Sequence, residues 1–217
     1  MIAAPPLRFA SPIDELPMND GREPIAPSWW RVLRWRPWSL ELEPVSPAHS
    51  ARVARALSED IAAWLGIGGL DEMRAGTPVW AAESHELALR GDTYRYLVVQ
   101  DGVLAGVIEL RRDAVNGHIG YWLRTESRGK GTITRANRLI LLIAFEGLGL
   151  KAVDWTAADG NDDSIAVMTR LGAEYMDTYP TPGRLYRDSE VRYRLTRRSH
   201  HVADSGPRNL RELLTCD

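Results

Sequence analysis

The chain has 217 residues, enough for one domain with extensions, and its 44% hydrophobic fraction is ordinary for a globular protein. The formal net charge of -2 gives no general attraction to nucleic acid or to a membrane, so we expect neither as a partner. The only cysteine, Cys216, excludes an internal disulfide framework and a cysteine-based zinc site and favours a reducing cytoplasm.

Two further features favour a cytoplasmic protein. No apolar run approaches the length of a membrane-spanning helix, and the N-terminus lacks the order of charges of a signal peptide. Residues 1–38 are predicted to form an extended arm, because closely spaced prolines prevent regular structure. Four of its last residues are Trp29, Trp30, Trp35 and Trp38. Their rings are expected to pin the arm to the domain, or alternatively to wall a substrate entrance.

From residue 39 to residue 195 the pattern predicts alternating strands and helices. Strands are expected at residues 39–44, 94–99, 104–111, 118–123, 152–156, 173–177 and 191–195. Helices are expected at residues 47–65, 77–90, 132–145 and 161–171, with tight turns at 100–103 and at Asn116-Gly117. The early hairpins are antiparallel, whereas the strand–helix–strand unit between residues 119 and 156 requires a parallel crossover. The pattern therefore predicts a mixed sheet covered by helices.

A glycine-bearing turn between a strand and a helix is the strongest local feature. Gly129 and Gly131 let the backbone approach a ligand closely, and the first amides of the following helix have no intrahelical partner. With the positive end of the helix dipole behind them, these amides suit a pyrophosphate, and Arg128 and Lys130 would add positive charge. By itself such a turn is often only a turn.

Five blocks in order carry a resemblance to a known family. They are Ile119–Leu123, Arg128–Gly131, Thr134–Ala136, Leu148–Leu150, and Asn161–Ser164 followed by Leu171-Gly172. This set resembles the GNAT N-acetyltransferases, and most closely the Rim type, named for acetylation of ribosomal-protein N-termini. The resemblance covers residues 39–195 as the catalytic domain, leaving 196–217 as a polar tail. It implies an α/β (α+β) GNAT fold with a mixed, mostly antiparallel twisted sheet. Six to seven strands, a splayed central parallel pair and about four flanking helices are expected.

The resemblance implies acetyl-CoA as the acetyl donor and no metal. In the family a glycine-bearing turn binds the pyrophosphate and the preceding strand pairs with the pantetheine arm, which the Asn of the next helix also contacts. Carried onto this chain, the cofactor-binding residues are Tyr121, Trp122, Leu123, Arg128, Gly129, Lys130, Gly131, Thr132, Ile133, Thr134 and Asn161. At the position of Ile133 most of the family carries a small residue, whereas Rim-type members also carry a larger apolar one.

Acetyl transfer to an amine needs a neutral amine, donors for the oxyanion and help for the leaving thiolate. Glu109 is the first candidate for the base, although the same carboxylate could lie on the solvent side of its strand. His118 is a second candidate, but such a histidine is more often structural. Many family members carry a tyrosine as acid where this chain has Met168, which cannot donate a proton. Ser164 could serve instead, or could be an ordinary first-turn serine.

The sequence leaves the acceptor open. The leading hypothesis is a protein or peptide amine, either the N-terminal α-amine or a lysine ε-amine. A small-molecule amine such as an antibiotic or polyamine is the alternative, and a catalytically silent acyl-CoA-binding module is the third. The amphipathic stretch Leu210–Leu214 is predicted to dock on a second subunit, giving a homodimer, or to cover a sheet edge.

Overall fold

The computed structural model describes residues 27, 29–65, 68–181, 188–200 and 206–215. They form one eight-stranded sheet in the order β1-β2-β3-β4-β5-β6-β8-β7, in which only β5 and β6 are parallel. The strands are β1 (Leu33–Trp35), β2 (Leu40–Pro44), β3 (Thr93–Gln100), β4 (Val103–Asp113), β5 (Asn116–Leu123), β6 (Ala152–Ala158), β7 (Glu174–Pro180) and β8 (Ser189–Thr196). The mixed, mostly antiparallel sheet expected from the sequence is confirmed, although it has more strands than expected.

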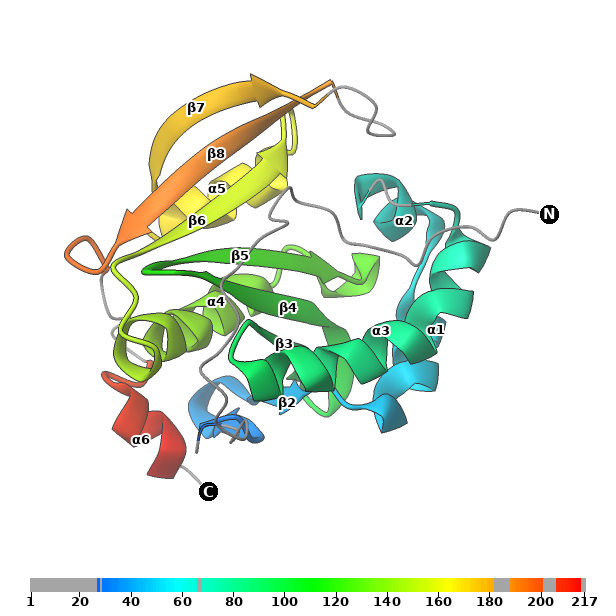
Figure 1. Cartoon of the computed structure of the whole chain (residues 1–217), viewed down its shortest axis with the longest axis horizontal. Helices are drawn as coiled ribbons and strands as arrows, with labels where there is room; N and C mark the ends of the chain where they lie inside the picture. Colours follow the sequence, from blue (N-terminus) through cyan, green and yellow to red (C-terminus); the bar gives the residue numbers. More distant parts are fainter. Residues whose placement is uncertain (1–26, 28, 66–67, 182–187, 201–205, 216–217) are drawn as a thin grey trace.

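Helices cover both faces of this sheet (Figure 1). The α-helices are α1 (Ser50–Ala56), α2 (Glu59–Leu65), α3 (Leu70–Arg90), α4 (Thr132–Leu142), α5 (Asp162–Arg170) and α6 (Leu210–Thr215). The short turns are η1 (Arg36–Trp38), η2 (Pro47–His49), η3 (Thr125–Ser127) and η4 (Ile143–Gly147), the last a π-helical turn that continues α4. No described helix is both long and apolar enough to cross a membrane.

The two faces bury separate apolar cores. Behind the sheet in Figure 1, α4 and α5 pack on the larger core, which includes Tyr96, Ile108, Ile140 and Trp155. In front of it, α1 and α3 pack on a smaller core over β3 and β4. Because strand side chains alternate between faces, β3 and β4 contribute to both cores.

The parallel pair β5–β6 separates along its length. Pairing runs from Asn116 opposite Ala152 to Ile119 opposite Trp155. β5 then continues to Leu123, and the two strands diverge in Figure 1. The splayed central pair expected from the resemblance is therefore present, and it leaves one backbone edge of β5 without a strand partner.

Several boundaries differ from the sequence predictions. The helix expected from residue 77 begins at Leu70 as α3. Leu33–Trp35 forms β1, a strand too short to show an alternating pattern among tryptophans and arginines. The first predicted helix is broken at Leu57, which is extended with ψ 142°, so that α1 and α2 are separate. The second β-hairpin turns at Ala114, with φ 47°, rather than at Asn116-Gly117. Gly117 lies inside β5, where a Cβ atom would come within 2.8 Å of the Leu150 side chain.

The two edges of the sheet are treated differently. At the β1 edge, α6 packs on β1 and on η4, with Leu210 and Leu213 buried. The Leu210 amide donates to Glu146 Oε2 at 2.7 Å, which holds α6 against η4. The predicted amphipathic stretch therefore lies along a sheet edge of its own chain. At the other edge, the register of β7 against β8 shifts at a bulge between Tyr175 and Asp177.

The tryptophans before β2 pack on the domain. Trp29 is 6% exposed, and its ring meets Tyr94 edge-on at 4.6 Å between centroids. Trp38 is also buried, and Trp30 stands edge-on to Tyr96. These contacts support the prediction that the rings attach the preceding segment to the domain. The domain boundary itself stays a prediction.

Candidate active site

The glycine turn predicted to bind a diphosphate joins η3 to α4. Gly129 has φ 70° and Gly131 has φ 73°, in the left-handed region that favours glycine. A Cβ atom added at either position would meet nothing within 4 Å. The left-handed backbone conformation therefore requires these two glycines, whereas contacts with neighbouring atoms do not. Open space remains above the backbone at both positions.

The amides of this turn are available to a ligand. Among the described residues, no backbone carbonyl is recorded as accepting from the amides of Gly129–Thr134, and those of Thr132–Thr134 form the first turn of α4. Thr132 is 1% exposed, and its hydroxyl has no hydrogen-bond partner in the part of the chain described. Unpaired donors at the positive end of an eleven-residue helix fit a diphosphate.

Arg128 is committed to contacts within the protein. Its guanidinium donates to the Leu123 carbonyl at 3.1 Å and to Asp60 Oδ2 on α2 at 2.6 Å. Burial raises the pKa of Asp60, but hydrogen bonds from Ser58 and Arg128 outweigh burial and hold that pKa below its ordinary value. Arg128 therefore ties the turn to the end of β5 and to α2. Lys130 is exposed and free to reach a phosphate.

The predicted pantetheine-binding residues lie at the splayed end of β5. Tyr121 packs against the larger core on the α5 side. Trp122 packs on the α1–α3 side, against the smaller core and against one further apolar cluster beside it. Leu123 is 9% exposed and pairs with Gly106 of β4. The β5 edge that faces β6 is left open from Gly120 onward, so an extended ligand could add to it as a strand does.

Ser164, held by Asn161, meets Tyr121 across this gap. Asn161 caps α5, and its Oδ1 accepts from the Ser164 amide at 3.2 Å. The Ser164 hydroxyl lies 2.9 Å from the Tyr121 hydroxyl. Burial raises the pKa of Tyr121 to about 12, so the phenol stays protonated at neutral pH. Met168, 1% exposed, is part of the core and supplies no polar group to the gap.

Glu109 faces the α1–α3 side and is held by two arginines. Its Oε2 accepts from Arg95 Nε at 2.5 Å, and its Oε1 lies 3.3 Å from Arg111 Nε. Burial raises the pKa of Glu109, but the charges of Arg95 and Arg111 outweigh burial and hold the pKa below its ordinary value. Arg95 is itself buried and also donates to Ser84 on α3 at 3.0 Å. A carboxylate so stabilised is a weak proton acceptor.

His118 belongs to the same network and is also a weak base. A guanidinium can only donate, so Nδ1 of His118 accepts from Arg111 at 3.1 Å. Nε2 then carries the proton and donates to Thr156 Oγ1 at 3.3 Å. Burial and the Arg111 charge lower the pKa of His118 to about 4. Both ring nitrogens are engaged, which supports the structural interpretation of this histidine.

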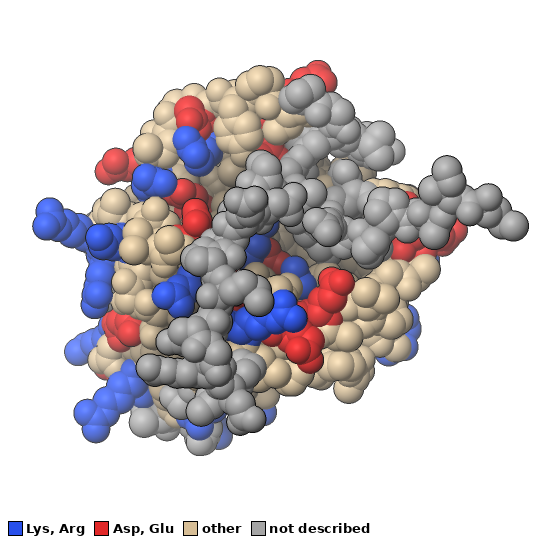
Figure 2. All heavy atoms as spheres, in the orientation of Figure 1, with Lys and Arg blue, Asp and Glu red and all other residues tan. Residues whose placement is uncertain are grey.

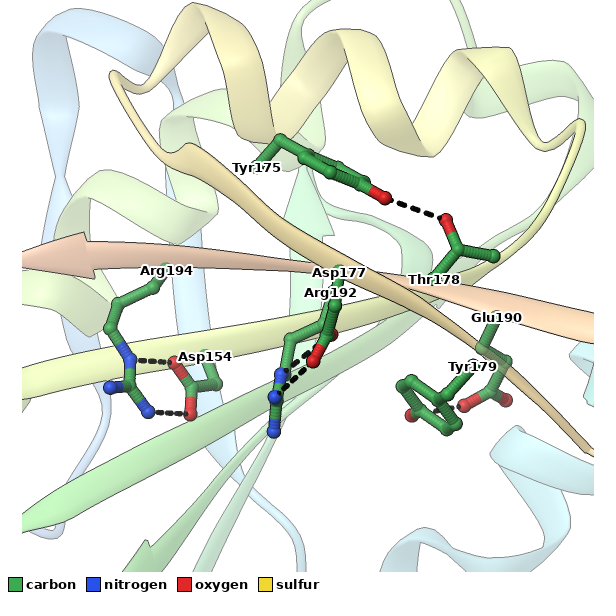
Figure 3. Close-up of polar contacts among 8 residues, drawn as sticks. All are labelled: Asp154, Tyr175, Asp177, Thr178, Tyr179, Glu190, Arg192 and Arg194. Atoms are coloured by element: carbon green, nitrogen blue, oxygen red, sulfur yellow. Dashed lines mark hydrogen bonds and ion pairs between the residues drawn. The ribbon is translucent and has the colours of Figure 1, made fainter.

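The polar face continues across β6, β8 and β7 (Figure 3). Arg194 bonds both oxygens of Asp154, at 2.6 and 2.7 Å, and Arg192 bonds both oxygens of Asp177. These pairs lie on the side of the sheet away from α5, and Figure 2 shows acidic and basic side chains mixed on the corresponding surface. The charges compensate one another, so this surface offers no excess of one sign.

Two further hydroxyls, those of Tyr179 and Tyr175, lie on opposite sides of β7. The Tyr179 hydroxyl donates to Glu190 at 2.7 Å, and Glu190 is only 3% exposed. The Tyr175 hydroxyl lies 3.0 Å from Thr178 Oγ1, on the α5 side (Figure 3). The described contacts therefore place neither hydroxyl beside Ser164.

The sequence missed several side chains that organise this region. Asp60, Arg95 and Arg111 come from elements far apart in the chain, and none belongs to a short motif. Asn137 is completely buried in α4, and its Oδ1 accepts from Trp155 Nε1 of β6 at 3.3 Å. The one available signal was a polar residue within the apolar stripe of a predicted helix, which requires a buried partner.

A turn of unpaired amides, an open strand edge and a hydroxyl pair therefore meet at the splayed end of the parallel pair, an arrangement that fits an acyltransferase. The chain belongs to the GNAT family, since the family model for the acetyltransferase (GNAT) domain matches residues 39–174. The resemblance seen in the sequence is thus confirmed.

One curated relative is similar to a segment of the chain. A segment is 46% identical over 78 residues to "Putative ribosomal N-acetyltransferase YdaF" of Bacillus subtilis (strain 168). This match covers 35% of the chain and 43% of that relative, less than half of either.

Two solved structures share the fold. RimJ of Mycobacterium smegmatis, in complex with CoA-disulfide, superposes with a TM-score of 0.69 at 19% identity, over 83% of this chain and 94% of that one. An acetyltransferase of Salmonella typhimurium, described as modifying the N-terminal serine of ribosomal protein L7/L12, superposes with a TM-score of 0.62. Its identity is also 19%, over 73% and 95% of the two chains.

Proposed function

We propose that this enzyme transfers the acetyl group of acetyl-CoA to the N-terminal α-amine of a protein. The observation that carries the proposal is the combination of the open β5 edge with the unpaired amides of Gly129–Thr134. The RimJ neighbour holds a CoA species, and the Salmonella neighbour is described as acting on an N-terminal serine, both of which support the choice.

The residues fit coenzyme A in a consistent direction. The amides of Gly129, Gly131 and Thr132, with Lys130, would hold the diphosphate at the N-terminus of α4. The free β5 edge beside Tyr121–Leu123 would hold the extended amide-bearing arm, and Asn161 marks its far side. The cofactor supplies an activated acetyl thioester, whose carbon forms a bond to the amine nitrogen while the carbon–sulfur bond breaks.

Two protons must be managed in this transfer. The ammonium must lose one proton before its nitrogen can attack, and a second leaves the nitrogen as the amide forms. The departing sulfur carries away the electron pair of the broken bond and takes up one proton. Ser164 lies at the open gap, and we assign it the role of donating a proton to the departing sulfur.

The weakness of the two predicted bases favours an α-amine as acceptor. Glu109 has a lowered pKa, and His118 titrates at about 4, so neither accepts a proton readily from an ammonium group. An α-amine titrates about 2.5 pH units below a lysine, so its neutral form is about 300-fold more abundant at pH 7. An enzyme without a strong base can use the first amine far more readily than the second.

The proposal is tested with matched peptides and labelled acetyl-CoA. One peptide carries a free N-terminus and no lysine; the other has a blocked N-terminus and one lysine. We expect at least tenfold faster labelling of the first, with a rate that rises with pH and levels near the pKa of the amine itself, about 8. Faster labelling of the lysine peptide, or labelling of polyamines and aminoglycosides alone, would refute the proposed acceptor. Failure to label any amine would favour the silent binding module.

We further propose that Glu109 positions Arg95 and Arg111, in place of the base role predicted from the sequence. Glu109→Gln removes the negative charge that faces the buried Arg95 guanidinium, so we expect a loss of about 3 kcal/mol in unfolding free energy. Turnover of the folded variant should fall less than about tenfold, whereas loss of a general base typically costs 100-fold or more. Glu41→Gln, at a more exposed ion pair with Arg34, is the matched control. A hundredfold loss of turnover at unchanged stability would restore the base assignment.

A further inference from the structure

We propose that Tyr121 is a positioning residue for the leaving group: its phenol donates to Ser164 Oγ and so directs the Ser164 hydroxyl proton into the gap between β5 and β6. This inference rests on the proposed function and deepens it. It assigns the strand residue Tyr121 a side-chain role, where the sequence indicated only that its backbone would contact the cofactor.

The geometry of the strand pair brings the phenol to this place. Tyr121 follows Ile119, the last β5 residue paired with β6, by two positions, so its side chain lies on the same face. Two positions beyond Trp155, the partner of Ile119, β6 carries the small residue Ala157. The tyrosine ring can therefore extend across the splayed gap to α5, where its hydroxyl meets Ser164 at 2.9 Å.

The direction of the hydrogen bond follows from the two hydroxyls. A phenol is more acidic than an aliphatic alcohol, so it is the better donor of the pair. The phenol oxygen also lies 3.5 Å from the Ser164 carbonyl, an acceptor that favours the same orientation. Since burial raises the pKa of Tyr121 to about 12, the phenol keeps its proton through the pH range of catalysis.

The rest of the site fixes Ser164 for this task. Asn161 holds the Ser164 amide, which leaves the serine side chain to the tyrosine and to whatever enters the gap. With its oxygen accepting from Tyr121, the Ser164 hydroxyl can give its own proton to a sulfur. A donor already polarised by a second donor stabilises an anion more strongly, because successive hydrogen bonds reinforce one another. Met168 makes this arrangement necessary, since no tyrosine stands at its position.

The test measures the pKa of the thiol of bound coenzyme A from the ultraviolet absorbance of the thiolate. The protein carries Cys216→Ser throughout, so that its only cysteine adds no signal. We expect the bound thiol to titrate below the ordinary value of about 8.5. Tyr121→Phe and Ser164→Ala should each raise this pKa by about one unit, and the double variant should be no worse than Ser164→Ala alone. Tyr193→Phe, which alters a half-buried ring on the same core in β8, should leave it unchanged.

Steady-state kinetics supply the second measurement. Tyr121→Phe should lower kcat about tenfold with KM for acetyl-CoA unchanged, and the effect should vanish in the Ser164→Ala background. A normal thermal midpoint establishes that each variant is folded. If Tyr121→Phe leaves both the thiol pKa and kcat unchanged in an active enzyme, the inference fails while the proposed function stands. If the parent protein neither binds coenzyme A nor labels an amine, the proposed function fails first.

Discussion

The two faces of the sheet differ in what packs around the same splayed strands: one is mainly apolar and the other carries charged side chains. Behind β5 and β6, an almost wholly apolar core holds α4 and α5, and its fully buried polar contact joins Asn137 to Trp155. In front, β3, β4 and β5 carry a polar network in which hydrogen bonds and an ion pair join Arg95, Glu109, Arg111 and His118. One face is held together by apolar packing, and the other by ion pairs and hydrogen bonds among its polar side chains. The comparison teaches that a buried carboxylate and histidine can be held by neighbouring arginines that leave both weak as bases.

The largest expected effect tests the charged face by pH. The folded pKa of His118, about 4, lies below the ordinary 6.5, so the unfolded chain binds more protons between these values. Unfolding free energy should therefore fall as pH drops from 6.5 to 4, with about 3 kcal/mol due to His118 alone. His118→Gln, which can still accept from Arg111 and donate to Thr156, should remove that share. Denaturation curves at several pH values measure it, and identical pH slopes in both proteins would contradict it.

The second prediction concerns the glycine turn before α4. Gly131→Asp places a carboxylate beside the unpaired amides, so affinity for coenzyme A should fall about 100-fold by calorimetry, since the charge repels the diphosphate. Gly149→Asp is the control, because Gly149 has φ 67° and equally open space but lies beyond the far end of α4. Equal losses of affinity in both variants would remove the turn from the binding site.

A smaller effect is expected on the apolar face. Trp155→Phe keeps most of the buried ring but leaves the Asn137 side-chain oxygen without its donor, which should cost about 1 to 2 kcal/mol in urea denaturation. The double variant with Asn137→Leu removes both polar partners and should recover part of the loss. A double variant less stable than Trp155→Phe would show that Asn137 serves another contact.

The smallest effect is expected at the link between α2 and the turn. Arg128→Lys cannot hold both the Leu123 carbonyl and Asp60, but both charged groups are about one-third exposed. Stability should therefore change by less than about 1 kcal/mol, and affinity for coenzyme A by a few-fold. Titrations at low and high salt provide the measurement. A loss as large as that of Gly131→Asp would mean that the guanidinium itself binds phosphate.

The order of elements and the glycine turn before α4 could be predicted because both depend on local sequence. A turn such as Arg128–Thr134 acts through its backbone, so two glycines before a helix are sufficient to suggest it. The contacts of Glu109 with Arg95 and of His118 with Arg111 could not be predicted, because these partners lie on neighbouring strands whose register the sequence does not fix. The structural interpretation of His118 was available from the sequence. β1 was missed since three residues carry too little periodicity, and the Tyr121–Ser164 pair because it spans a gap between elements.

The treatment of the sheet edges has a consequence for handling the protein. An open sheet ends in two strands whose outer N–H and C=O groups could recruit another chain into a fibril or precipitate. Here α6 lies against β1, and the bulge beside Met176 together with Pro180 interrupts β7. Removing the chain from Leu210 onward would uncover the β1 edge, so variants shortened in this way should aggregate when the protein is concentrated.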